Sequence, residues 1–118
     1  MSRSSWKKSS NLNLWTGERM KVPKSIRIAG HEIKIVYKDS LSSDGTPCVG
    51  LAFLSQDRIE LARTIEGVPL SNDQLATAFL HEALHIISTL HSLAFNEKKV
   101  TALEVALYPF LHENKLKF

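Results

Sequence analysis

Apolar and polar positions divide the chain into a strand-rich first half and a helical second half. On both sides of Gly30-His31, apolar residues alternate with polar ones, which is the period of a β-strand and predicts a β-hairpin. Residues 38–47 have the composition of a loop, and Asp44-Gly45 is its predicted turn. The alternating apolar residues of the hairpin are Ile26, Ile28, Ile33, Ile35 and Tyr37.

Two more short strands are predicted at residues 49–54 and 58–62, joined through Ser55-Gln56-Asp57. In the second of them, Ile59 and Leu61 alternate with the charged residues at positions 58 and 60. This alternation predicts one solvated face, and we expect the strand to form an edge of the sheet.

A long helix is predicted from Ser71 to about Leu90. Its start is marked by a capping box, with Ser71 as the N-cap and Gln74 three residues later. Most of its circumference is apolar, so we expect the helix to be buried between other elements. One stripe remains polar and consists of Gln74, Thr77, His81, His85, Ser88 and Ser92.

A second helix is predicted after a break, with Asn96 as its N-cap and Val100, Leu103, Leu107 and Phe110 on its apolar stripe. Pro109 is expected to kink or end it. Together these elements predict an α+β fold. We expect a small antiparallel or mixed sheet of three to four strands to pack on the buried helix and on a second, C-terminal helix.

Composition changes this picture at the N-terminus. The chain has 118 residues, 43% of them hydrophobic, which predicts one domain with a modest core. Its net charge is +3, but residues 1–27 hold seven lysines and arginines against Glu18, so the remainder carries −3. We therefore predict a basic, mobile arm at residues 1–19 and a single domain at residues 20–118. An alternative is that Met20 begins the functional unit.

Cysteine content and hydropathy bear on the cellular compartment. Cys48 is the only cysteine, which excludes an intramolecular disulfide and a thiolate-rich zinc site. Neither a signal peptide nor a stretch of membrane-spanning length is visible. We expect a soluble, cytoplasmic protein that has no membrane partner.

Candidate chemistry is concentrated at Leu80-His81-Glu82-Ala83-Leu84-His85-Ile86, which contains the pattern HExxH. Residues four apart lie about 40° apart around a helix, so both imidazoles can reach one cation. Glu82 points about 100° away from His81, where it can hold a water molecule beside the metal. The alternative is that the histidines belong to the solvated face of an amphipathic helix. Glu82 and the apolar flanking residues favour the metal site.

Three residues could supply a third protein ligand. His91 gives the spacing of metzincins, but Ser88 replaces their glycine and no methionine follows to form their Met-turn. Glu97 and Glu104 share one stripe of the second helix, and an antiparallel pair of helices places each about 5 Å along the axis from His85. Geometry does not choose between the two glutamates. We expect the one that is not a ligand to be a surface residue or to accept a hydrogen bond from a histidine N–H.

From Met20 onward, the order of elements resembles that of small phage and prophage zinc peptidases close to the ImmA/IrrE group and the minimal gluzincins. The resemblance depends on the HExxH residues and on Asn96-Glu97-Lys98-Lys99-Val100. It implies a zincin-like fold and a third ligand at the start of the following helix, which Glu97 matches. Many relatives carry an acidic or amide residue four positions later, whereas this chain has Thr101, so Glu104 stays an alternative.

The resemblance implies a zinc-dependent peptidase in which His81, His85 and Glu97 hold Zn²⁺ and Glu82 is the general base. The partner would be a protein or peptide substrate, such as a phage or host regulator, and the location would be the host cytoplasm if a phage encodes the chain. The substrate is expected to lie along the strand at residues 58–62. The residues considered for oxyanion stabilisation are Tyr37, Tyr108 and His31.

Two other functions remain open from the sequence. The chain could bind nucleic acid through its basic arm, where Trp6 and Trp15 could stack on bases. It could also bind a metal and a partner without turnover.

Overall fold

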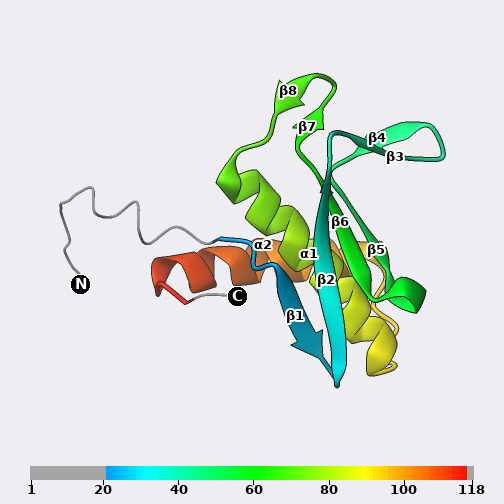
Figure 1. Cartoon of the computed structure of the whole chain (residues 1–118). Helices are drawn as coiled ribbons and strands as arrows, with labels where there is room; N and C mark the ends of the chain where they lie inside the picture. The colour runs from blue at the N-terminus through cyan, green and yellow to red at the C-terminus, as the bar shows by residue number, and fades with distance from the viewer. Residues whose placement is uncertain (1–20, 117–118) are drawn as a thin grey trace.

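The computed structural model describes residues 21–116, so the predicted arm at residues 1–19 lies outside the described part. Four strands form a mixed sheet in the order β1-β2-β6-β5, and two helices pack beside it (Figure 1). This arrangement confirms the predicted α+β fold. The strands are β1 (Ser25–Ile28), β2 (His31–Lys38), β5 (Gly50–Phe53) and β6 (Arg58–Ala62), and the helices are α1 (Asn72–Leu90) and α2 (Glu97–Glu113).

The predicted first hairpin is confirmed. β1 and β2 pair antiparallel, with Ile28 opposite His31. The turn places Ala29 at φ 49° and Gly30 at φ 85°, the left-handed conformations that a tight two-residue hairpin turn needs. β2 then pairs parallel with β6, which makes the sheet mixed.

The expectation that residues 58–62 form a sheet edge is wrong. β6 lies between β2 and β5, and the edge strands are β1 and β5. The polar alternation in β6 has another cause, because Arg58 Nε donates to Glu60 Oε2 over 2.9 Å. Glu60 is only 7% exposed, so its charge is paired on a covered face of the sheet instead of being solvated.

Residues 38–47 contain more structure than the expected loop. β3 (Leu41–Ser43) and β4 (Thr46–Cys48) form a short hairpin around the predicted Asp44-Gly45 turn. A second small hairpin, β7 (Thr64–Ile65) with β8 (Val68–Pro69), precedes α1. A 3-10 turn, η3 (Leu54–Gln56), joins β5 to β6. Strands of two or three residues are too short to show a period in the sequence.

α1 is the middle layer of the fold, as its all-round apolar pattern predicts. Its capping box is present, with the Ser71 hydroxyl accepting from the Gln74 N–H over 3.1 Å. Phe79, Ala83 and Ile86 pack into the core beneath the sheet. On the other side, Leu80 and Leu84 pack on Val100 of α2. This burial fixes the helix between two layers and determines which stripe stays open.

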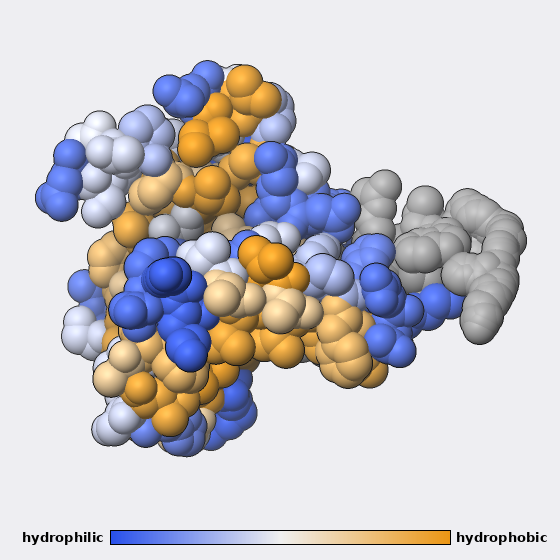
Figure 2. All heavy atoms as spheres, turned by 180° about the vertical axis from the view of Figure 1, so that it is seen from behind, coloured by the Kyte–Doolittle hydropathy of each residue, from blue (hydrophilic) through white to orange (hydrophobic). Residues whose placement is uncertain are grey.

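α2 begins after Asn96, whose side chain accepts from the Lys99 N–H over 2.8 Å. Pro109 does not end the helix, which continues to Glu113. The carbonyl that proline leaves without a partner belongs to Val105, and the 64% exposure of that residue lets water reach this side of the helix. Seen from behind, the surface mixes hydrophobic and hydrophilic residues (Figure 2). None of the described helices has the length and apolarity to cross a membrane.

Candidate metal centre

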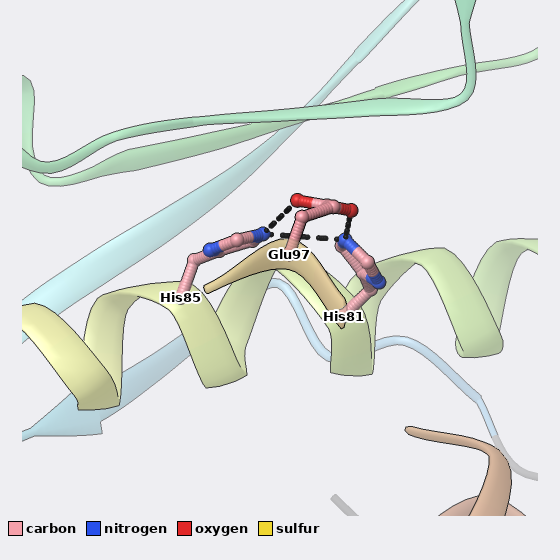
Figure 3. A group of neighbouring side chains, drawn as sticks. All are labelled: His81, His85 and Glu97. Atoms are coloured by element: carbon pink, nitrogen blue, oxygen red, sulfur yellow. Dashed lines mark hydrogen bonds and ion pairs between the residues drawn. The ribbon is translucent and has the colours of Figure 1, made fainter. Parts of the chain in front are cut away.

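The two motif histidines point to the same side of α1, and the carboxylate of Glu97 spans them (Figure 3). The two Nε2 atoms are 3.2 Å apart. Glu97 Oε2 lies 2.7 Å from His81 Nε2, and Glu97 Oε1 lies 2.8 Å from His85 Nε2. One donor atom from each of these residues lies within 4.8 Å of the others, which makes the group able to hold a metal ion.

The connection between the helices explains why Glu97 reaches the histidines. Ser88 is buried at 4% exposure, and its hydroxyl accepts from the Phe95 N–H over 2.8 Å. This bond holds the segment that leads into α2. Asn96 then caps the helix, so Glu97 is its first residue and extends over the open stripe of α1.

The donor set fits a catalytic type of zinc site. Two imidazoles and one carboxylate leave a fourth position for water. Ligand atoms at zinc–ligand distances of about 2.05 Å and tetrahedral angles would lie about 3.3 Å apart, close to the separation of the two Nε2 atoms. The Glu97 oxygens are closer than that to the nitrogens, but its side chain is 69% exposed and can move back.

Glu104, the alternative ligand, contacts the ring nitrogen of His81 that points away from the metal group. Its Oε1 lies 2.8 Å from His81 Nδ1. An Nδ1–H donated to Glu104 leaves the Nε2 lone pair of His81 directed toward the site. Burial lowers the pKa of His81, but the bond to Glu104 and the charges of Glu97 and Glu82 outweigh it and raise the pKa above its ordinary value.

Glu104→Ala is expected to lower the affinity for Zn²⁺ by about 10- to 100-fold, because the ring of His81 loses the partner that orients it. Competition with a chromophoric zinc chelator measures the change. Glu113→Ala, at the exposed end of α2, is the matched control and should bind like the parent. Equal affinities for the two variants would show that Glu104 does not orient His81.

Glu82 lies under β5, beside the histidines. Burial raises its pKa above the ordinary value of a carboxyl, although the charges of His81 and His85 oppose this shift. A Cβ atom at Gly50 would lie 3.1 Å from Glu82 Cγ and 3.2 Å from Leu61 Cδ2. The missing side chain at Gly50 therefore gives Glu82 its space between the edge strand and the helix.

Gly50→Ala is expected to destabilise the protein by about 1–3 kcal/mol, because the added methyl group is overpacked against Glu82 and Leu61. Urea denaturation measures this cost. In a Glu82→Ala background one of the two crowded contacts disappears, so the same substitution should cost less. Strictly additive effects in this double-mutant cycle would show that Gly50 does not set the position of Glu82.

Two cavities lie on either side of Glu82. The larger, of about 580 Å³, extends from His81 toward the start of α1 and reaches Asp73 and Leu70. The smaller, of about 330 Å³, lies on the His85 side against Leu51 and Ala52 of β5. Glu82 lines both cavities, so the two together form a groove along β5. The side of α1 that carries the two histidines is the floor of this groove.

The other candidates from the sequence lie elsewhere. His91 forms the C-cap of α1 and is not part of the metal group. Tyr108 donates to Asp73 Oδ1 over 2.7 Å, and His31 pairs with Asp57 at 3.2 Å. Tyr37 packs against the core beneath the Arg63 guanidinium. None of these contacts involves the metal group.

Gly50 and Asp73 line the larger cavity, although no sequence motif marks either residue as part of the site. A lone glycine in a short strand is a signal of close backbone approach, but nothing in the sequence identifies the partner. Asp73 lies between the two residues of the capping box, and its distance from His81 along the chain hides the cavity that the two residues share. Comparison of the chain with protein-family models, with curated proteins and with solved structures finds no match.

Proposed function

We propose that the chain is a zinc-dependent endopeptidase of the gluzincin type, similar to the small phage peptidases of the ImmA/IrrE group. The observation that carries this proposal is the convergence of His81, His85 and Glu97 beside Glu82. Metal sites that serve only structure are closed by four protein ligands, whereas three ligands and a neighbouring carboxyl are typical of hydrolases.

His81, His85 and Glu97 would hold the ion. Zn²⁺ supplies a Lewis acid that makes water acidic near neutral pH and polarises a carbonyl. Glu82 accepts the proton of the attacking water on its carboxylate and passes it to the leaving amine. The direction of its pKa shift suits both halves of this task, because a carboxyl with a raised pKa is a stronger base toward the water and holds the proton until the amine leaves.

A peptide substrate fits along β5. This strand is an edge of the sheet, and its residues line both cavities beside Glu82. An extended peptide could pair with the free backbone groups of β5 and pass over Glu82. This placement replaces the one at residues 58–62, since β6 is paired on both sides.

Removal and return of the metal test the proposed activity. The full chain, loaded with Zn²⁺, is expected to cleave members of a mixed peptide library, with cleavage sites identified by mass spectrometry. A chelator such as 1,10-phenanthroline should abolish cleavage, and added Zn²⁺ should restore it. Stoichiometric zinc binding without cleavage of any peptide would contradict the proposal and favour a metal-binding protein without turnover.

A further inference from the structure

The larger cavity beside Glu82 is acidic. Four carboxyl groups line it, and lysine and arginine are absent from the described residues that form its wall. The four acids are Asp73, Glu82, Glu97 and Glu104.

Three of these acids already have a role at the metal group. Glu82 is the proposed general base, Glu97 contacts both histidines, and Glu104 contacts His81. Burial favours a proton on Glu82, but the other three carboxylates would still outnumber the two positive charges of a divalent ion, so the cavity stays net negative after metal binding. Asp73 is the acid that lies away from the histidines.

Asp73 is held in place at the far end of the cavity. It precedes His81 by eight residues, or about 12 Å along the helix. The Tyr108 hydroxyl donates to Asp73 Oδ1 over 2.7 Å and fixes the carboxylate. Burial and the bond to Asp73 raise the pKa of Tyr108, so the hydroxyl stays a donor at neutral pH.

The wall between Asp73 and Glu82 is partly apolar, with Val49, Leu70 and Ala78 among its residues. An aliphatic stem can pack on such a wall while its charged end reaches a carboxylate. Two residues of an extended peptide span about 7 Å, so a long side chain one or two places from the bond over Glu82 would reach Asp73.

We propose that this cavity binds a lysine or arginine side chain of the substrate, and that Asp73 is the residue that selects it. This inference rests on the proposed peptidase function and names its substrate class: peptides with a cationic residue close to the cleaved bond. The aliphatic stem packs on the apolar wall, and the charge pairs with Asp73.

The test measures peptide binding in addition to turnover. Full-length, Zn²⁺-loaded protein carrying Glu82→Gln is titrated calorimetrically with end-blocked, alanine-rich peptides. Each peptide contains one lysine or, at the same position, the uncharged norleucine. We expect the best lysine peptide to bind about 2- to 5-fold more tightly than its norleucine partner, as one ion pair with an exposed carboxylate should. This ratio should fall as salt rises from about 50 mM to about 500 mM.

Asp73→Asn should reduce the ratio to about one, since it removes the charge but keeps an oxygen that can accept from Tyr108. Asp44→Asn, in the exposed turn between β3 and β4, is the matched control and should keep the ratio. A ratio near one in the protein with Asp73 intact, or a preference that survives Asp73→Asn, would overturn the inference.

Cleavage by the protein with Glu82 intact separates the two proposals. Cleavage without a preference for lysine would overturn the role of Asp73 and leave the peptidase function standing. Tight binding of lysine peptides without cleavage would contradict the peptidase function and leave the role of Asp73 in binding standing.

Discussion

His85→Ala is expected to lower the affinity for Zn²⁺ by a factor on the order of 100 or more. Only three protein ligands are available to the ion, so the loss of one removes a large share of its binding free energy. The Nε2 of His85 contacts both the His81 ring and Glu97, and no other described histidine lies in the metal group. Zinc stoichiometry after dialysis and chelator competition measure the loss.

His91→Ala is the matched control for this experiment. His91 follows His85 on the same helix, but it forms the C-cap and lies outside the metal group. It should bind zinc like the parent. Loss of zinc in both variants would point to a ligand set built on His91, and loss in neither would rule out the proposed centre.

Glu82→Gln is expected to retain zinc and to lower the hydrolysis rate by about 10²- to 10⁴-fold, as removal of a general base does. Glutamine has the size and the carbonyl oxygen of glutamate but cannot accept the proton. Because Glu82 is not among the residues of the metal group, zinc stoichiometry should remain at the parent value. The decisive measurement is kcat at saturating peptide, compared at equal zinc content.

Stability serves as a check on this variant. Burial raises the pKa of Glu82, so the folded protein binds the proton of this carboxyl more tightly than the unfolded chain does. Stability therefore falls as the pH rises from the ordinary pKa of a glutamate to the raised pKa in the folded protein. Glutamine has no such dependence, and Tm at neutral pH should not decrease. Glu32→Gln, exposed on β2, should leave both rate and Tm unchanged. An unchanged rate in Glu82→Gln would exclude Glu82 as the base.

The main elements could be predicted because each is specified by residues close together in the sequence. The capping box at Ser71, the N-cap at Asn96 and the alternation around Gly30 are local signals, and all three are observed. The position of β6 could not be predicted. Its neighbours are β2 and β5, and a polar residue such as Glu60 looks the same in the sequence whether water or Arg58 is its partner.

In the candidate site, too, contacts within one helix could be predicted from the sequence, whereas contacts between the two helices could not. His81 and His85 are one helical turn apart, so the sequence alone brings them together. The choice between Glu97 and Glu104 depends on how α2 docks on α1, which periodicity does not determine. The structure places Glu97 at both histidines and Glu104 behind His81, so the two glutamates have different contacts within one network.

The metal group joins residues of two layers, with two donors on α1 and one at the first residue of α2. Beyond this group, α2 is held to α1 by the apolar cluster around Leu80, Leu84 and Val100 and by the bonds of Glu104 and Tyr108 to residues of α1. Because Glu97 lies on α2 and both histidines lie on α1, an opening that lifts the start of α2 would remove one ligand of a bound ion. Metal binding would therefore favour the closed position of α2, and the concentration of free metal would set how often this helix detaches.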